Sequence, residues 1–378
     1  MLNKLKKNNF IKFSYSLKLT VVCLIVLTVL TIWGTIYQTD NGLYAAKAKF
    51  FTSWFFLAFG FIPFPGGALT LAVLFMNLIS SMFFRIGFRL KNIGNILTHL
   101  GILILLLGGF FTFLFSEESV LMLKEGEKSS WSNSYNAWEL SVWNDKDGVR
   151  HYSVIDLVDI EPDESLSFPD FPIKLNVKKS FSNASAFRNK EGSSEQNVIN
   201  ASGIVSIDER KRETEPEANI PGIMLSSEDI NKNIILYGGE TIPTHVKIMG
   251  SDYHFSLRKL RKKLPLELGL LDFRIKKYPG SEIVKSYEST VEIKHEELKR
   301  ELVISMNKPL RYKDYTFFQS SYQITPAGVE YSVFAVVKNS GRLLPYISSI
   351  VVFLGLLIHF ILMLFRKRKE SSDTIKGN

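Results

Sequence analysis

Four long apolar runs alternate with polar sequence along this chain. They cover Leu19–Tyr37, the uncharged stretch Trp54–Phe84, Asn95–Phe115 and Leu343–Phe365. A run of about 20 apolar residues has the length that crosses the hydrocarbon core of a bilayer. The pattern predicts an integral membrane protein with four transmembrane α-helices, which we place at residues 19–37, 68–84, 95–115 and 343–365.

The second apolar run is interrupted before its helix begins. The segment Pro63-Phe64-Pro65-Gly66-Gly67 contains two prolines close together, which end a helix. The preceding aromatic residues, from Trp54 to Ile62, suit the membrane–water interface, where tryptophan is enriched. We therefore predict an outer loop with an interfacial aromatic segment at residues 38–67, followed by the spanning helix.

A polar segment separates the third and fourth apolar runs. Several short stretches in it alternate apolar and polar residues with the period of half-buried strands, as in Glu139–Trp143, Ile173–Val177, Thr290–Ile293 and Val329–Val337. This pattern predicts a large, mostly-β extracytoplasmic domain at residues 116–341. The stretch Ser180–Asn219 lacks the apolar content for a packed element, and we expect it to form a mobile loop.

The basic residues orient the spans, because Lys and Arg in short loops stay on the cytoplasmic side. They gather in the N-terminus (1–18), the connector (85–94) and the tail (366–378), at Lys4, Lys6, Lys7, Lys12, Lys18, Arg85, Arg89, Lys91 and Arg366-Lys367-Arg368-Lys369. The β domain then lies on the outer face. Much of the formal charge of +9 belongs to these anchors. We expect the lipid bilayer as a partner, and no nucleic acid.

Several classes of chemistry lack their residues in this sequence. The first apolar run has no small-residue cleavage site after it, so we interpret it as a retained anchor. A single cysteine, Cys23, excludes an internal disulfide, a CxxC redox pair and a multi-cysteine metal site. There is no C-x-x-C-H motif and no catalytic motif. We predict no catalytic residue, and we do not expect the chain to be an enzyme by itself.

Two histidines lie inside apolar runs. His99 is the only titratable residue of the third run, and His359 lies in the fourth. An ionisable side chain at membrane depth is a functional hypothesis by default. Each lies roughly 10 Å inside the cytoplasmic boundary at about 1.5 Å per residue. They could therefore share one layer and ligate haem iron. The alternative is that each histidine only forms hydrogen bonds across a helix interface.

Small residues surround His99, at Gly94, Gly101 and Gly108-Gly109. They permit close helix packing, room for a flat macrocycle, or both. The outer histidines have no metal-ligand spacing, and we interpret them as surface residues: His151, His245, His254 and His295. We predict no metal site beyond haem iron. The basic run Arg258–Lys263 is expected to be a solvated face, with anionic headgroups or haem propionates as the alternative.

Four patches of this sequence resemble the ResB/CcsB family of cytochrome c biogenesis proteins, the membrane partner in system II. The first patch lies in the opening helix and comprises Leu17-Lys18-Leu19 with Trp33–Gln38. The second surrounds the second and third spans and comprises Pro63–Gly67, Asn77-Leu78 and Ile93–Gly109. The third lies in the β domain, at Leu271–Arg274, Tyr278–Ser281 and Ser286–Ser289, and the fourth, which is the most specific, is Asn307–Tyr322.

The resemblance implies a protein of the bacterial inner (cytoplasmic) membrane that, with a CcsA/ResC-type partner, holds or exports haem and presents it to apocytochrome c. That partner carries a tryptophan-rich motif and external haem-ligating histidines, and this chain has no such tryptophan cluster. The chain would be the non-catalytic half of a haem lyase, with haem b as cofactor. The third-span histidine of the family maps onto His99 as an axial ligand. His359 is a second, weaker candidate.

Two other functions remain as alternatives. The first is a membrane-anchored ligand-binding or sensor protein without haem, although the sequence after Arg366 predicts no cytoplasmic effector domain. The second is a small transporter. Four spans without an intramembrane carboxylate argue against ion-coupled transport.

Overall fold

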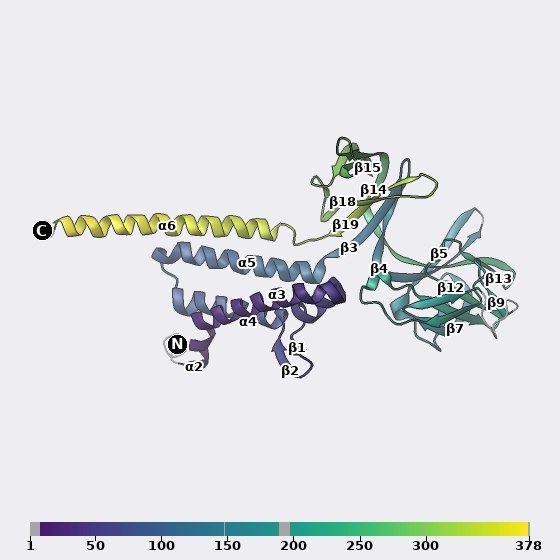
Figure 1. Ribbon diagram of the computed structural model, residues 1–378, viewed down its shortest axis with the longest axis horizontal. Helices are drawn as coiled ribbons and strands as arrows, with labels where there is room; N and C mark the ends of the chain where they lie inside the picture. The colour runs from purple at the N-terminus through teal and green to yellow at the C-terminus, as the bar shows by residue number, and fades with distance from the viewer. Residues whose placement is uncertain (1–7, 147, 189–196, 297, 377–378) are drawn as a thin grey trace. The chain divides into compact units, whose positions relative to one another are not determined.

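The computed structural model describes residues 8–146, 148–188, 197–296 and 298–376 (Figure 1). It divides into two compact units, which we describe separately. The first comprises Met1–Glu117 with Lys338–Asn378 and is helical, and the second, Glu118–Val337, is built of β-strands. Four apolar helices and a mostly-β domain are therefore confirmed.

The described residues of the helical unit form five α-helices: α2 (Asn9–Ser14), α3 (Leu17–Ala46), α4 (Gly67–Ser80), α5 (Ile93–Phe115) and α6 (Leu344–Lys376). Short π-helical turns, η1 (Lys47–Phe51) and η2 (Ser81–Ile86), extend α3 and α4, and the 3-10 turn η3 (Leu90–Asn92) precedes α5. Four helical segments are long and apolar enough to cross a membrane, namely Leu17–Phe51, Gly67–Ile86, Leu90–Phe115 and Leu344–Arg366. The first extends well past Tyr37, with a kink at Gly42, whose φ of 80° suits glycine.

The aromatic segment between α3 and α4 is a β-hairpin. Strands β1 (Phe55–Ala58) and β2 (Ile62–Pro65) pair antiparallel and project away from α3 (Figure 1). Phe56 and Ala58 on its inner side pack against Leu30 and Phe50 in a small apolar core. Pro63 and Pro65 thus lie in β2, a strand of an isolated hairpin, where a missing backbone N–H is tolerated.

Asn77 ties the start of α3 to α4. Its amide nitrogen donates to the main-chain oxygens of Ser14 at 2.7 Å and Ser16 at 3.1 Å, and its oxygen accepts from Thr20 Oγ1 at 2.6 Å. The side chain is only 2% exposed. All of its polar atoms are therefore used, as a buried amide requires.

The β unit contains two large sheets. The larger has the order β16-β15-β14-β4-β3-β19-β18-β17, with β5 paired to β4 and β13 to β14, and the smaller has the order β6-β7-β11-β12-β9. The strands are β3 (Glu117–Lys124), β4 (Lys128–Lys146), β5 (Val149–Asp156), β6 (Ser165–Phe168), β7 (Phe171–Phe181), β8 (Ala184–Phe187), β9 (Val198–Ile199), β10 (Ser206–Glu209), β11 (Gly222–Ser227), β12 (Ile230–Tyr237), β13 (Thr244–Ile248), β14 (Ser251–Lys277), β15 (Val284–His295), β16 (Leu298–Ser305), β17 (Leu310–Tyr312), β18 (Tyr315–Ile324) and β19 (Glu330–Lys338).

Two apolar cores share the long strand β14. One core packs Leu140, Phe255 and Leu257 of the larger sheet against the smaller sheet, including Leu175 and Leu225. The second core joins Leu268 and Leu270 of β14 to β15, β18 and β19. Irregular register between β14 and β4, at Lys259–Arg261 and Lys263–Leu268, separates the two stretches of β14. Such bulges bend and twist a strand, which lets one long strand serve two cores.

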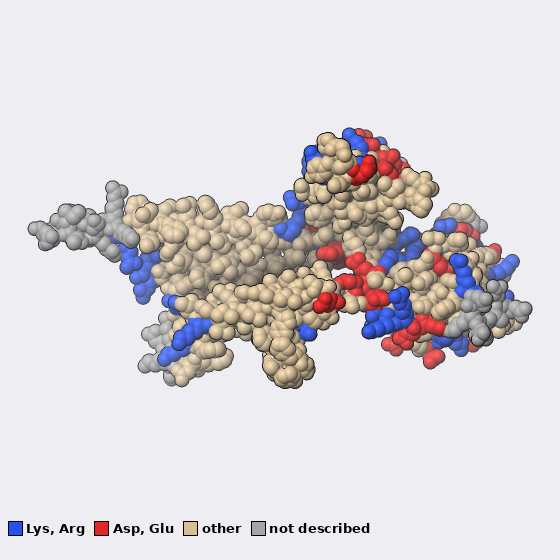
Figure 2. Space-filling view, in the orientation of Figure 1, with Lys and Arg blue, Asp and Glu red and all other residues tan. Residues whose placement is uncertain are grey.

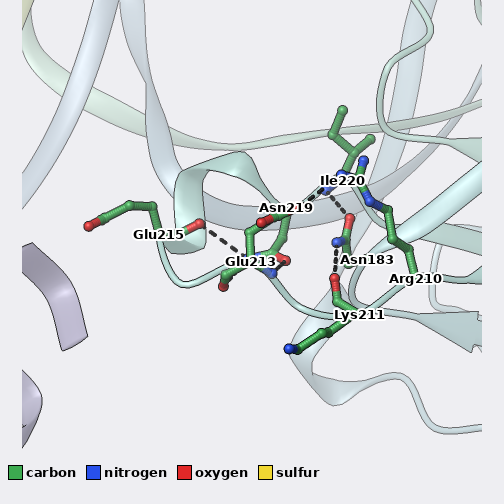
Figure 3. A network of polar contacts seen from close by, with 7 residues as sticks. All are labelled: Asn183, Arg210, Lys211, Glu213, Glu215, Asn219 and Ile220. Carbon is green, nitrogen blue, oxygen red and sulfur yellow. Dashed lines mark hydrogen bonds and ion pairs between the residues drawn. The ribbon is translucent and has the colours of Figure 1, made fainter. Parts of the chain in front are cut away.

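The expected loop at Ser180–Asn219 is partly wrong. Strands β8 and β10 pair within it, and a small core forms around Ile204 and Ile207. Buried Asn183 stabilises this region, because it donates to the Lys211 carbonyl at 2.7 Å and accepts from the Ile220 amide at 3.2 Å (Figure 3). A few isoleucines and asparagine side chains therefore order a segment of polar composition. Residues 189–196 lie outside the described part of the chain.

Candidate functional site

His99 makes one hydrogen bond within its own helix. Its Nδ1 lies 2.8 Å from the main-chain oxygen of Asn95, one turn earlier in α5. A carbonyl oxygen can only accept, so the imidazole donates from Nδ1 and its Nε2 keeps a free lone pair. Nε2 has no hydrogen-bond partner within the described residues. Histidines that bind metals commonly donate their other ring nitrogen in this way, so His99 is suited to ligate iron.

The side of α5 that carries His99 faces α4. Ile96 and Leu103, three residues before and four residues after it, share its face of the helix. Both are buried in a cluster with Leu78 and Met82 of the α4–η2 segment. His99 itself is half-buried. The imidazole therefore shares a helix face with apolar side chains, and its Nε2 has no hydrogen-bond partner among the described residues.

Three glycines of α5 lie on a different side, against α6. Gly94, Gly101 and Gly108 recur every seven residues. A Cβ on Gly94 or Gly101 would come within 2.5 Å of an α6 atom, and one on Gly108 within 2.8 Å. In return, a Cβ on Gly355 would lie 2.5 Å from the Thr98 nitrogen, and Ser348 Oγ donates to the Gly101 carbonyl at 2.8 Å. The interpretation as close helix packing is confirmed. The backbone of α6 fills the space that a macrocycle would need on this face.

His359 lies in α6 at the level of Gly94. A Cβ on Gly94 would be 2.5 Å from the His359 nitrogen and 2.6 Å from its Cα. Five residues separate Gly94 from His99, which corresponds to about 7.5 Å along the axis and roughly 140° around it. The structure thus packs α5 against α6, with the backbone of His359 beside Gly94, five residues before His99. The ring of His359 instead makes an edge contact with Phe360, with centroids 5.7 Å apart.

The register of the β unit pairs two outer histidines that sequence spacing did not connect. His245 of β13 lies opposite His254 of β14, with ring centroids 5.1 Å apart. Trp143 of β4 stacks on His254 at 5.4 Å, and His245 Nε2 lies 2.9 Å from Asp252. The described residues contain no group of three or more His, Cys, Asp or Glu side chains able to hold a metal ion. The contacts among Trp143, His254 and His245 are best explained as cross-strand packing of aromatic rings.

A tight turn brings the two histidines opposite each other. His245 and His254 are equidistant from Met249 and Gly250, which both adopt positive φ, 48° and 82°. Two such residues form the tight turn that joins paired strands directly. The sequence Met-Gly does not belong to the usual dipeptides of this turn, so the hairpin was missed.

The basic run of β14 is only partly the solvated face that we expected. Arg258 Nε donates to buried Glu139 at 2.7 Å. Lys259 Nζ lies 4.2 Å from the centre of the Trp138 ring and donates to the Tyr135 carbonyl at 2.5 Å. Burial lowers the pKa of the Lys259 ammonium. These two cations stabilise the strand pair β4–β14, and the exposed positions of the run are Arg261 and Lys263.

A buried polar network joins three strands of the second core. Ser289 Oγ of β15 donates to Gln319 Oε1 of β18 at 2.7 Å and lies 2.8 Å from Ser332 Oγ of β19. Gln319 Nε2 donates to Ser332 Oγ at 2.9 Å. All three residues are at most 5% exposed. No motif in the sequence marks these three residues, although Ser289 and Gln319 lie in the patches that carry the family resemblance.

The aromatic residues near this network divide between core and surface. Phe317 is fully buried beside the network, whereas Phe318, next to it in the strand, is 39% exposed. Tyr315 and Tyr322 pack against the core from its edge. Alternation along β18 explains the difference, because successive side chains point to opposite faces.

The structure therefore belongs to a class of proteins that combine four apolar helices, each long enough to cross a membrane, with a large β-sheet unit. Residues 229–335, from the β12 region into β19, match the model of the ResB-like family. Over 337 residues the chain is 23% identical to Protein NrfI of Wolinella succinogenes. The aligned region covers 86% of this chain and 32% of that protein. The chain thus spans about a third of the length of this relative. The expected resemblance is confirmed over residues 229–335, a part of the β unit.

Proposed function

We propose that this chain is a membrane subunit of cytochrome c biogenesis that holds haem b at His99. With a tryptophan-rich CcsA/ResC-type partner, it would hold or export haem and present it to apocytochrome c. The ResB-like match supports the biogenesis role. The observation that carries the haem assignment is the hydrogen bond from His99 Nδ1 to Asn95, which leaves Nε2 free in apolar surroundings.

A position across the bacterial inner membrane fits the distribution of charge. The four apolar helices have the required length, and their long sides are nearly free of Lys, Arg, Asp and Glu in the view of Figure 2. Basic residues lie at the end of η2, in the connector before α5 and at the end of the apolar part of α6, at Arg85, Arg89, Lys91 and Arg366. Since basic loops stay inside, these ends would be cytoplasmic and the β unit would lie on the outer face.

The residues of this chain would perform three tasks at the haem. Nε2 of His99 would be an axial ligand, and its bond to Asn95 would fix the tautomer and the ring orientation. Ile96 and Leu103 would keep water away. The bound haem would supply an iron that accepts the imidazole lone pair and a macrocycle that suits an apolar cleft. We propose that the partner would supply any second ligand to the iron, because the contact between α5 and α6 at Gly94 involves the backbone of His359. His359 remains the weaker candidate.

The outer β unit would bind the partner or the acceptor cytochrome. Phe318 is the aromatic residue of the specific patch Asn307–Tyr322 that is most open to a protein, whereas Phe317 is inaccessible. An exposed aromatic ring is a common anchor of protein interfaces.

Maturation of cytochrome c in a strain that lacks this chain tests the proposal. We expect His99→Ala, supplied together with the partner, to abolish covalent haem attachment, as read by haem staining of the cytochrome. His359→Ala is the matched control and should retain attachment. Both variants must accumulate to the level of the wild type. Normal maturation with His99→Ala would contradict the proposal and favour an anchored ligand-binding or sensor protein without haem.

A further inference from the structure

The β1–β2 hairpin exposes an unusual amount of apolar surface. Its outer side chains are largely open, with Phe55 63%, Leu57 56%, Phe59 77% and Phe61 74% exposed. The inner residues of β1 alternate with them and are buried, as with Phe56 at 9%. Contiguous exposed apolar surface of this kind indicates a contact with another apolar phase.

The hairpin is held at a definite height along α3. Trp33 of α3 contacts the rings of Phe56, Phe59 and Phe64, with centroid distances of 5.7, 5.4 and 6.2 Å. Trp33 lies about 24 Å along the axis from Leu17 at the helical rise of 1.5 Å per residue. The apolar core of a bilayer is about 30 Å thick, so this height is near the outer end of the apolar span.

The first turn of α4 and the end of η1 lie at the same height. A Cβ on Gly34, next to Trp33, would be 2.9 Å from the Phe51 ring, and one on Gly67 would be 2.8 Å from the Phe51 oxygen. The hairpin therefore leaves the helices where α4 begins its own apolar span. It does not extend from the far tip of α3, which continues to Ala46.

Charge is absent from this part of the chain. No Lys, Arg, Asp or Glu occurs between Phe50 and Phe84. Just before this stretch, Lys49 places its ammonium 4.5 Å from the centre of the Tyr37 ring. Figure 2 shows the projecting hairpin in tan, with a basic side chain only near its base. Tyrosine and lysine mark the boundary between lipid and water, which again gives interfacial depth.

The turn of the hairpin places a phenylalanine in a costly conformation. Phe59 has φ of 53° and is followed by Gly60 with φ of 86°. A bulky residue in the left-handed region is a real outlier, because Asn or Gly adopts it with less strain. Strain that persists points to a role of the side chain, here an apolar ring at the exposed tip.

We propose that the β1–β2 hairpin is an interfacial anchor whose outer face contacts the acyl chains of the outer lipid leaflet. Its apolar surface continues that of α3, where Ile32 and Ile36 are 58% and 64% exposed. The free edges of a two-stranded hairpin need water, which the interface supplies and the hydrocarbon core does not. The proposal rests on the proposed membrane position of the chain and is independent of the haem assignment.

Spin-label accessibility in proteoliposomes tests the anchor. Phe61→Cys is labelled in a Cys23→Ala background of the full chain, and collisions with lipid-soluble oxygen and with an aqueous nickel chelate are compared. Phe113→Cys on α5, a residue 57% exposed, is the lipid reference, and Ile283→Cys in the β unit, 67% exposed, is the water reference. The label at residue 61 should collide with oxygen as the label at residue 113 does, and several-fold less with the chelate than the label at residue 283.

The outcomes separate the anchor from the membrane position itself. Collision with the aqueous chelate at residue 61, or shielding from both reagents by a covering protein, would overturn the anchor while residue 113 still reports lipid. Aqueous exposure at residue 113 would instead contradict the membrane position. Quenching of tryptophan fluorescence by brominated lipids gives a second measurement without labels. It should weaken in Trp54→Phe, because Trp54 is 60% exposed at the base of the hairpin. Unchanged quenching would also overturn the anchor.

Discussion

Gly94 of α5 lies directly against the backbone of His359 in α6, so closely that a methyl group on Gly94 would be 2.5 Å from the His359 nitrogen. Gly94→Ala should therefore separate the helices and cost about 1–3 kcal/mol, the usual range for overpacking. Unfolding of the purified chain in detergent measures this loss. Gly109→Ala is the matched control, because a Cβ there has no neighbour within 4 Å. Equal stability of the two variants would argue against the close packing.

The Asn77 contacts give a second prediction. Asn77→Ala removes three hydrogen bonds to the α2–α3 region, each worth about 0.6 kcal/mol between helices in a membrane environment. We expect the midpoint of thermal unfolding to fall. Thr28→Ala serves as the control, since Thr28 Oγ1 donates only to Leu24 of its own helix. An equal midpoint for Asn77→Ala and the control would mean that the contacts contribute nothing.

The polar network of the second core predicts a large difference between two glutamines of β18. Gln319→Leu leaves two buried hydroxyl groups with fewer partners and should cost about 1–3 kcal/mol. Gln323→Leu, at an exposed position of the same strand, should be nearly neutral. Denaturant unfolding followed by tryptophan fluorescence compares them. A neutral Gln319→Leu would show that the network does not stabilise the fold.

Glu292 makes the stability of the β unit depend on pH. Hydrogen bonds from Lys128 and Lys299 hold the pKa of its carboxyl below the ordinary value of 4.5. A lowered folded pKa contributes stability above pH 4.5, and this contribution is lost as the pH falls through the folded pKa.

Glu292→Gln should therefore lower the unfolding midpoint at pH 7 and flatten its decline in acid. Melting curves recorded between neutral and acidic pH measure both effects, with Glu301→Gln at the exposed cross-strand position as the control. A decline in acid as steep as that of the wild type would contradict the assignment.

The sequence predicts most of the helical unit and less of the β unit. Four helices follow from apolar runs long enough to cross a bilayer, and the break before the second helix follows from Pro63 and Pro65, whereas the pairing of β1 with β2 was not predicted. The contact of His245 with His254 depends on strand register, which a turn of unusual sequence sets. The order within Ser180–Asn219 depends on the hydrogen bonds of Asn183 and on a small core around Ile204 and Ile207. Composition does not report such contacts.

The sequence identifies His99 as the candidate site residue but does not predict its contacts. The isolated His99 stands out in its apolar run, and the structure adds the bond to Asn95. A common layer of His99 and His359 stays a prediction, and the structure adds that the backbone of His359 lies against Gly94, five residues before His99. Helix depth was predictable from sequence, whereas the height at which two antiparallel helices meet depends on which small residues face each other.

The absorption spectrum of the chain, purified together with its tryptophan-rich partner from haem-replete cells, tests the central claim most directly. We predict the Soret and visible bands of a six-coordinate haem in the wild type and in His359→Ala, and their loss or conversion to a five-coordinate spectrum in His99→Ala. Spectra of the wild type and His99→Ala that are identical, at equal protein and partner content, would contradict the claim that His99 holds haem.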